Sequence, residues 1–362
     1  MRVALVYLLL SSFLYAQSKL RLAAAGDLMC HDSQLNSAWQ SQTQSYHFHG
    51  SFQPIKSTLE QADLALANLE TTLPGKDFAG YPRFGTPDSF AEALFGVGFR
   101  LLVTANNHSV DRGIEGLQRT LDVLDRIGFA HTGTFRHAEE REKSPYLSLT
   151  KNGIKVAFLN YSYGTNGLPA PAGTVNFPLR KKQISEDIAR ARLDESDFII
   201  VYYHFGNEYE RHPNPTQREY AYFALDEGAH VVLGSHPHVI QPYELLQWED
   251  RYGEKRERLI AYSLGNFISG QTKPYTSTGL LLFFTLVKES KKIENVLPKL
   301  VYTLPSEGQF YVYPLPELFS TKIFHRLPRK KQKQIKREYQ EMSVHVQSYV
   351  NGRSLRERSL PE

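Results

Sequence analysis

The chain has 362 residues, of which 41% are hydrophobic, 22% charged and 12% aromatic. This composition is that of a globular protein with one large core or two modest ones, and it argues against long disordered stretches. The formal net charge of +4 gives no reason to expect a nucleic-acid partner. The single cysteine, Cys30, excludes an intramolecular disulfide.

The N-terminus has the pattern of a targeting segment. Met1 and Arg2 are followed by an apolar run from Val3 to Ala16 that only two serines interrupt. A short basic start and about 14 apolar residues predict a secretory signal peptide over residues 1–16, because a membrane-spanning helix needs about 20 residues. We therefore expect an exported protein, periplasmic or associated with the cell envelope. An uncleaved N-terminal anchor is the alternative.

The rest of the chain alternates between predicted strands and helices. Buried strands are predicted over 19–25, 63–67, 100–103, 198–202, 230–233, 259–263 and 280–286, and a hairpin over 146–149 and 155–159 around Asn152-Gly153. Helices are predicted over 54–61, 89–95, 114–127, 181–193 and 215–225. Residues 32–52, 71–87 and 164–178 read as loops, the last of them close to the site. This alternation predicts an α/β fold.

A Pro-rich stretch over 305–316 suggests that one domain spans 19–305 and that 306–362 is a C-terminal extension. Within this extension, residues 322–337 carry eight Lys or Arg and no acid. The simple interpretation is a solvated helix face. The alternative is a contact with an anionic lipid or polymer, since clustered positive charge attracts both.

Side chains that bind metals or move protons follow several of the predicted strands. They are Asp27; Asn68 and Glu70; Asn106, Asn107, His108 and Asp111; His204 and Glu208; His236 and His238; and Asn266. Each one alone has a structural explanation, such as a helix cap, a turn or a surface carboxylate. Parallel strands, however, bring their carboxyl ends to one edge of a sheet, so we expect these groups to converge.

Two histidines, His236 and His238, follow an apolar strand with Pro237 between them. Proline biases the preceding residue toward extended geometry, in which residues i and i+2 point the same way, so both imidazoles are expected to face one point. Imidazoles, carboxylates and an amide oxygen suit Mn²⁺, Fe²⁺ or Zn²⁺. One histidine cluster suits one ion, whereas a shared carboxylate suits two. A nearby histidine without a metal can protonate a leaving group.

Together these motifs resemble the CapA family, which is associated with poly-γ-glutamate capsule synthesis and is related to calcineurin-like metallophosphoesterases. The resemblance covers about residues 20–290. It rests on Gly26-Asp27-Leu28-Met29, Ala67-Asn68-Leu69-Glu70, Thr104-Ala105-Asn106-Asn107-His108-Ser109-Val110-Asp111-Arg112-Gly113, His204-Phe205-Gly206-Asn207-Glu208-Tyr209, Gly234-Ser235-His236-Pro237-His238 and Ser263-Leu264-Gly265-Asn266-Phe267. It implies a four-layer α/β/β/α sandwich with the site at the strand ends.

The resemblance also implies roles for the candidate residues. The implied metal ligands are Asp27, Glu70, Asn107, His204, His236 and His238. Asp27 and His238 would serve a first ion, His204 and His236 a second, and Glu70, or else Asn68, would bridge them. His108 is the implied general acid. The supporting residues around these ligands are Asn68, Asp111, Glu208, Tyr209 and Asn266.

The chain departs from the usual metallophosphoesterase pattern at the first strand. Those enzymes usually carry Asp-x-His there, whereas Asp27 is followed by Leu28 and Met29, and the nearest histidine is His31. They also usually have Asp where this chain has Glu70 or Asn68. The CapA group shares both departures. We therefore expect one or two divalent ions, with the first site the weaker.

Two functions follow from this pattern. The first is an exported metal-dependent hydrolase acting on a phosphoester or a γ-glutamyl amide bond in a capsule or cell-envelope polymer. The alternative is a non-catalytic component of capsule synthesis or export that binds an anionic polymer through residues 322–337, in contact with membrane-associated capsule machinery. A plain α/β protein without a site would require the polar clusters to lie apart.

Overall fold

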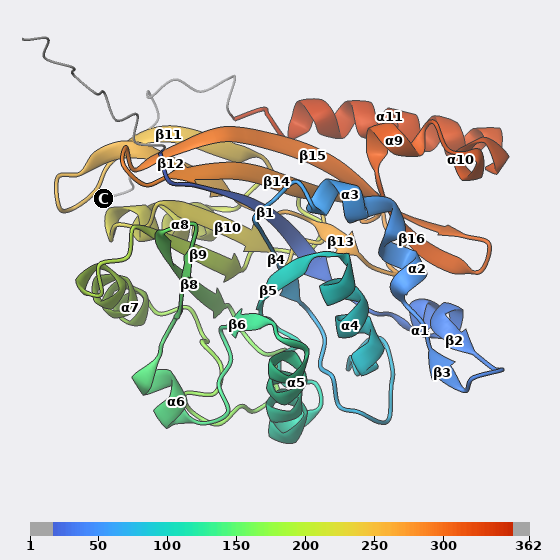
Figure 1. Cartoon of the computed structure of the whole chain (residues 1–362), viewed down its shortest axis with the longest axis horizontal. Helices are drawn as coiled ribbons and strands as arrows, with labels where there is room; N and C mark the ends of the chain where they lie inside the picture. Colours follow the sequence, from blue (N-terminus) through green and yellow to red (C-terminus); the bar gives the residue numbers. More distant parts are fainter. Residues whose placement is uncertain (1–16, 350–362) are drawn as a thin grey trace, which may run out of the picture.

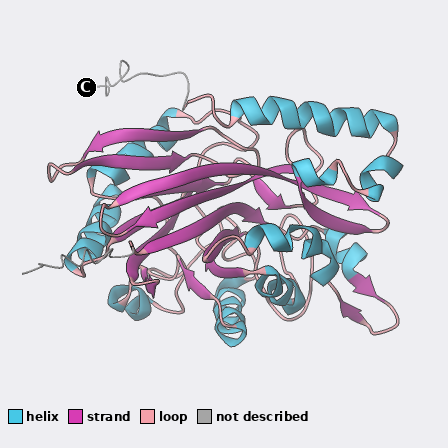
Figure 2. Cartoon of the chain, turned by 45° about the horizontal axis from the view of Figure 1, so that its top comes forward, coloured by secondary structure: helices cyan, strands magenta, loops and turns pink. Residues whose placement is uncertain are grey.

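The computed structural model describes residues 17–349. The predicted signal peptide, residues 1–16, lies outside the described residues. Within residues 17–349, no helix combines the length and the apolar character that crossing a membrane requires. Two large β-sheets form the centre of the molecule, with helices on their outer sides (Figures 1 and 2).

The first sheet has eight strands. Its order is β16 (Gln309–Pro314), β15 (Lys292–Ser306), β14 (Thr278–Val287), β1 (Lys19–Leu28), β4 (Leu64–Leu69), β5 (Phe99–Val103) and β6 (Ala130–Thr132), and β13 (Asn266–Ile268) also pairs with β1. Strands β1, β4, β5, β6 and β13 run parallel, whereas β14, β15 and β16 add antiparallel pairs. The parallel strands therefore end at one edge.

The second sheet has six strands. Its order is β11 (Tyr243–Glu249), β12 (Lys255–Ala261), β10 (Val231–Ser235), β9 (Phe198–His204), β8 (Ile154–Ser162) and β7 (Leu147–Lys151). The four central strands are parallel, and β7 and β11 are antiparallel edges. The hairpin predicted around Asn152-Gly153 is confirmed as β7 and β8, with both turn residues at positive φ.

Helices and short elements fill the connections. They are α1 (Asp32–Ala38), the small pair β2 (Trp39–Gln40) and β3 (Ser45–Tyr46), α2 (His49–Phe52), the 3₁₀ turn η1 (Gln53–Ile55), α3 (Lys56–Leu59), α4 (Asp88–Val97), α5 (Gly113–Ile127), α6 (Ala138–Lys143), α7 (Lys181–Leu193), α8 (Pro215–Asp226), α9 (Leu315–Leu318), α10 (Lys322–Arg326) and α11 (Arg329–His345). The predicted helices near α4, α5, α7 and α8 are confirmed.

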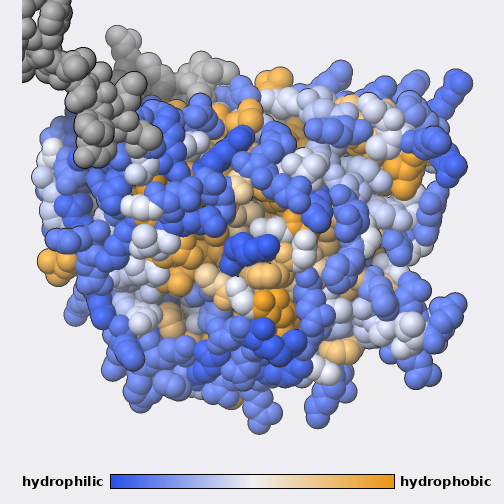
Figure 3. All heavy atoms as spheres, viewed as in Figure 1, coloured by the Kyte–Doolittle hydropathy of each residue, from blue (hydrophilic) through white to orange (hydrophobic). Residues whose placement is uncertain are grey.

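Successive strand residues bury opposite faces, and this alternation builds three apolar clusters. Leu22 and Phe158 belong to a cluster shared by the two sheets. Ala23 packs instead with residues of the helices that cover the first sheet, and Ile199 with those of α7 and α8. The α/β fold class is confirmed. On the face seen in Figure 3, hydrophilic side chains cover the margin, and apolar ones gather near the middle.

One local prediction is wrong, and a second is confirmed only in part. Residues 32–52 are not a loop, because Leu35, Phe48 and Phe52 are buried against the first sheet and hold α1 and α2 in place. The helix predicted over 54–61 is a 3₁₀ turn followed by the short α3.

The sheet continues past the predicted domain end at residue 305. Strand β15 runs to Ser306 and pairs with β16 as a hairpin. Helix α11 then buries Ile335 and Met342 in the cluster shared by the two sheets. The described part of the C-terminal extension, residues 306–349, thus packs in the same body.

Candidate metal centre

The carboxyl ends of parallel strands from both sheets approach one region (Figure 1). Asp27 is the next-to-last residue of β1, and Glu70 comes directly after β4. His204 ends β9, while His236 and His238 follow β10. All five side chains are buried. Neighbouring parallel strands thus explain why polar residues far apart in sequence converge here.

The approach of Asp27 depends on the glycine before it. A Cβ added at Gly26 would lie 1.8 Å from the carbonyl oxygen of Gly265, so this position has no room for a side chain. The backbone N–H of Asp27 donates to that same oxygen over 3.0 Å. The Gly-Asp pair therefore lets β13 lie directly against β1 and fixes the position of the carboxylate.

Glu70 is the centre of the cluster. Its Oε1 atom lies 3.6 Å from Nε2 of His204 and 4.0 Å from Nε2 of both His108 and His238. Neither carboxylate oxygen has a hydrogen-bond partner among residues 17–349, although both are buried. Burial first, and then the negative charge of Asp27, raise the pKa of Glu70 well above its usual range. A buried carboxylate without donors is a group that a cation would stabilise.

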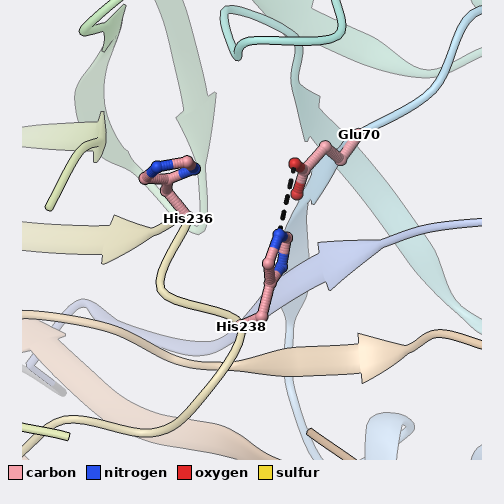
Figure 4. A group of neighbouring side chains, drawn as sticks. All are labelled: Glu70, His236 and His238. Atoms are coloured by element: carbon pink, nitrogen blue, oxygen red, sulfur yellow. Dashed lines mark ion pairs between the residues drawn. The ribbon is translucent and has the colours of Figure 1, made fainter. Parts of the chain in front are cut away.

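The loop that carries His236 and His238 is not extended as predicted. The two residues have φ values of +101° and +59°, in the left-handed region. Such backbone costs about 1–3 kcal/mol at each residue and persists only where the surroundings enforce it. Here the N–H of Tyr209 donates to the carbonyl of Pro237 over 2.8 Å. Both imidazoles nevertheless lie near Glu70 (Figure 4), and the ring centroids of His236 and His238 are 6.0 Å apart.

Two overlapping groups of side chains have the spacing of metal ligands. One is Glu70 with His236 and His238, and the other is Glu70 with Asp27 and His204; in each group the ligand atoms lie within 4.8 Å of one another. This grouping differs from the expected one, which paired His204 with His236 and Asp27 with His238. In both versions Glu70 is shared, which is the arrangement that a bridging ligand requires.

Asp27 and Glu70 have opposite electrostatic environments. Burial alone would raise the pKa of Asp27, but its hydrogen bond to His238 and the charges of His238 and His204 hold that pKa well below the usual range. Asn68 also donates to Oδ1 of Asp27 over 2.8 Å. Asn68 therefore stabilises the carboxylate of Asp27, whereas the carboxylate of Glu70 has no hydrogen-bond donor among the described residues.

His204 and His236 are held as neutral imidazoles. Burial lowers the pKa of His204 well below its usual range, and so does the nearby ring of His236, because two protonated imidazoles this close would repel each other. Burial and the charge of His238 lower the pKa of His236 to about 3. His204 Nε2 lies 2.8 Å from Oδ1 of Asn107, so these two predicted ligands touch each other. His236 Nδ1 is buried and has no hydrogen-bond partner in the described part of the chain.

His108 lies beside the cluster with its two ring nitrogens in different surroundings. Nδ1 lies 2.7 Å from Oδ2 of Asp111, which also accepts the backbone N–H of Phe84 over 2.6 Å. An ionised carboxylate only accepts hydrogen bonds, so Nδ1 of His108 is the donor. Nε2 then faces Glu70, 4.0 Å from Oε1.

The remaining supporting residues lie at the margin of the cluster. Asn266 places Oδ1 3.0 Å from Nδ1 of His238. The ring of Tyr209 is half-buried with its centroid 6.1 Å from that of His238, and Glu208 beside it is exposed. His31 accepts the N–H of Gly270 at Nδ1 and belongs to neither ligand group.

Tyr163 is a site residue that the sequence analysis missed. Its ring centroid lies 4.5 Å from that of His236 and 6.3 Å from that of His204, and its backbone N–H donates to the carbonyl of His204 over 3.0 Å. It directly follows β8, so it stands at a strand end like the other candidates. That position was the signal that could have found it.

These residues fit a divalent cation. The carboxylate oxygens of Glu70 and Nδ1 of His236 are buried without hydrogen-bond partners among the described residues, and neutral imidazole is the form that binds metals. A set of imidazoles, carboxylates and an amide oxygen suits Mn²⁺, Fe²⁺ or Zn²⁺.

Known proteins agree with the fold and the family. The chain is 25% identical to "Capsule biosynthesis protein CapA" of Bacillus anthracis over 68% of its length, and 28% identical to "PGA biosynthesis protein CapA" of Bacillus subtilis over 57%. These matches span 60% and 52% of the two relatives. Among solved structures, the NAD nucleotidase NadN of Haemophilus influenzae shares the fold, with a TM-score of 0.51, 15% identity, and coverage of 90% of this chain and 63% of that one.

The family comparison covers the whole candidate centre. Residues 21–271 match the family described as "Bacterial capsule synthesis protein PGA_cap", a span that runs from before Asp27 to beyond Asn266. The resemblance to CapA proteins is thereby confirmed by two independent relatives and by the family pattern. This chain belongs to the bacterial capsule synthesis protein PGA_cap family.

Proposed function

We propose that this chain is an exported, divalent-metal-dependent hydrolase of capsule or cell-envelope polymer metabolism, which cleaves a phosphoester or a γ-glutamyl amide bond. The observation that carries this proposal is the buried, unpartnered carboxylate of Glu70 among three histidines. Family membership and the capsule-related names of the relatives support the polymer context.

The ligand groups define how a cation would be held. Glu70, His236 and His238 would hold one ion, and Asp27, Glu70 and His204 a second. A divalent cation there supplies Lewis acidity, which polarises a phosphoryl or carbonyl group and lowers the pKa of water. Of the two carboxylates in these groups, Asp27 already accepts a hydrogen bond from Asn68, whereas neither oxygen of Glu70 has a donor among residues 17–349.

His108 would move the proton. Asp111 fixes the imidazole through Nδ1 and leaves Nε2 directed at the cluster. When the ring carries a proton on both nitrogens, Nε2 would give its proton to the leaving oxygen or nitrogen and Nδ1 would keep the one bonded to Asp111; general acids accelerate this step by about 10²–10⁴-fold. Phe84 packs edge-on against the ring, with centroids 4.7 Å apart, and keeps it in place.

The test is hydrolysis with the purified chain, using p-nitrophenyl phosphate and a γ-glutamyl oligomer as separate substrates. Turnover of one of them should require added Mn²⁺, Fe²⁺ or Zn²⁺ and should stop with a chelator. The His108→Asn variant should keep its bound metal and lose turnover. If the metal-loaded wild-type chain turns over neither class of bond, the hydrolase proposal is wrong.

The alternative, a non-catalytic polymer-binding component of capsule synthesis, is favoured by the basic residues 322–337 on α10 and α11. Seven of the eight cations are exposed, and only Arg326 and Arg337 form ion pairs with acids among the described residues. Deleting this tail is not a clean test, because Ile335 and Met342 are buried in the core. Neutralising exposed lysines tests the idea without disturbing the fold.

A further inference from the structure

A cavity lies under α11, next to residues that support the metal centre. It has a volume of about 430 Å³, within the usual range for small-ligand pockets. Its walls come from the loop 269–277, from the β15–β16 hairpin through Tyr302 and Phe310, and from one face of α11. Figures 1 and 2 show α11 lying along the outside of the sheets.

Helix α11 divides the basic run into two faces. Lys331, Gln334 and Arg337 line the cavity, at the spacing of three residues that places side chains on one side of a helix. Lys330 and Lys333 are exposed and are not part of the cavity wall. The basic stretch is therefore not a uniform solvated face.

The acids of the cavity are already engaged. Glu338 accepts the hydroxyl of Thr278 over 2.5 Å, and Glu341 accepts the hydroxyl of Tyr275 over 2.7 Å. Two cations of the wall, Lys273 and Lys331, have no acidic partner within ion-pair distance in the described part of the chain. The ammonium of Lys331 lies 5.8 Å from the ring centroid of Tyr302. The wall thus offers positive charge next to aromatic surface.

Two chains of contacts connect this cavity to the metal centre, and both end at His238. In the first chain, Nδ2 of Asn266 donates a hydrogen bond to Oε1 of Gln271, in the cavity wall, over 3.0 Å. The other amide atom of Asn266, Oδ1, lies 3.0 Å from Nδ1 of His238. Lys273 lies 3.6 Å from the ring centroid of Tyr209, whose ring packs beside His238. A ligand in the cavity would therefore lie next to the residues that support a metal ligand.

We propose that this cavity is a subsite for a negatively charged unit of a polymeric substrate, distant from the bond that is cleaved. The proposal rests on the proposed function, since it places the remainder of the same substrate. Unpaired Lys331 and Lys273 would recognise the anion, and Tyr302 and Phe310 would contact the chain between its charges. The α11 and hairpin walls lie outside the family match of residues 21–271.

The experiment measures polymer binding to metal-free protein, so that its outcome does not depend on metal chemistry. Isothermal titration would compare a γ-glutamyl octamer with a dimer, using wild type, Lys331→Gln/Arg337→Gln and the matched control Lys330→Gln/Lys333→Gln. The cavity pair should weaken octamer binding by about tenfold or more, and the control pair by about twofold or less. Dimer binding should not respond to the cavity pair.

Three results separate the alternatives. Equal losses in the cavity and control pairs would mean diffuse attraction to the helix, which overturns the subsite. Failure of the wild-type chain to bind both the octamer and polyphosphate also overturns it, whereas failure to bind metal would instead overturn the proposed function. Short-chain polyphosphate, titrated in parallel, distinguishes a carboxylate polymer from a phosphate polymer: loss of binding in the cavity pair with either anion supports the subsite. Circular dichroism should show both pairs folded.

Discussion

The Oε1 atom of Glu70 lies 3.6 Å from Nε2 of His204, and no hydrogen-bond donor reaches either oxygen of this buried carboxylate within residues 17–349. In the absence of a cation, this arrangement costs stability, because Glu70 must either bury an unpartnered charge or take up a proton that the unfolded chain does not hold. The same arrangement becomes favourable once a divalent ion binds. The local instability of the metal-free chain is thus linked to its proposed function.

Replacing the central carboxylate should separate stability from metal binding. Glu70→Gln removes a buried group whose ionisation is unfavourable, so the metal-free variant should be more stable than metal-free wild type by about 1–3 kcal/mol near neutral pH. Urea unfolding measures this free energy. The exposed Glu60→Gln change serves as the control and should leave it unchanged. A metal-free variant less stable than wild type would contradict this account.

The pair of His108 and Asp111 can be tested through turnover. Asp111→Ala removes the acceptor that holds Nδ1, so the imidazole loses its fixed orientation toward Glu70. We expect kcat to fall by about 10²-fold or more with metal content unchanged, since general acid catalysis depends on position. Metal analysis and kinetics on the same sample give both values. Loss of metal together with activity would assign Asp111 a structural role instead.

The close approach of β13 to the end of β1 can be tested by adding a methyl group at Gly26. A Cβ at Gly26 would overlap the carbonyl of Gly265, so Gly26→Ala should lower the free energy of unfolding by more than about 3 kcal/mol, or prevent folding. Gly164→Ala is the matched control, because nothing lies within 4 Å of its added Cβ. Similar effects for the two substitutions would show that β13 does not approach β1 this closely.

A pH effect should come from Asp187, on α7 outside the metal centre. Burial raises its pKa to about 6, while Arg141 and the hydroxyl of Tyr161 partly oppose that rise. The folded chain therefore holds this proton up to a higher pH than the unfolded chain. The stability that Asp187 contributes is present below about pH 4 and is lost as pH rises through about 6.

Asp187→Asn should remove this part of the pH dependence. The difference in unfolding free energy between variant and wild type, measured in urea from pH 4 to pH 8, should change across that window and stay constant above it. Asp77→Asn, at an exposed position, should show no such change. A constant difference for Asp187→Asn would mean that its pKa is not raised in the folded chain.

Much of the fold was predictable because its signals are local. The apolar strands and the periodic pattern of α5 report burial directly, and the strand-end rule correctly indicated that Asp27, Glu70 and His204 converge. Segment 32–52 was misread as a loop, because its few buried residues make sense only once the sheet that covers them is known.

The finer geometry of the site depended on contacts distant in sequence. Pro237 favours an extended backbone at His236, yet His236 and His238 both have positive φ. Two hydrogen bonds from distant parts of the chain hold this loop: the N–H of Tyr209 donates to the carbonyl of Pro237, and the N–H of His236 donates to Oδ2 of Asp27. The division of the ligands into two groups, and the cavity under α11, arise where several elements meet. Local sequence patterns do not contain this information.

The most direct test of the central claim is the metal content of the purified chain. After purification with Mn²⁺ or Zn²⁺ present, elemental analysis should find about one or two ions per chain in wild type and almost none in Glu70→Gln. A wild-type chain that is folded and carries no metal under these conditions would contradict the account.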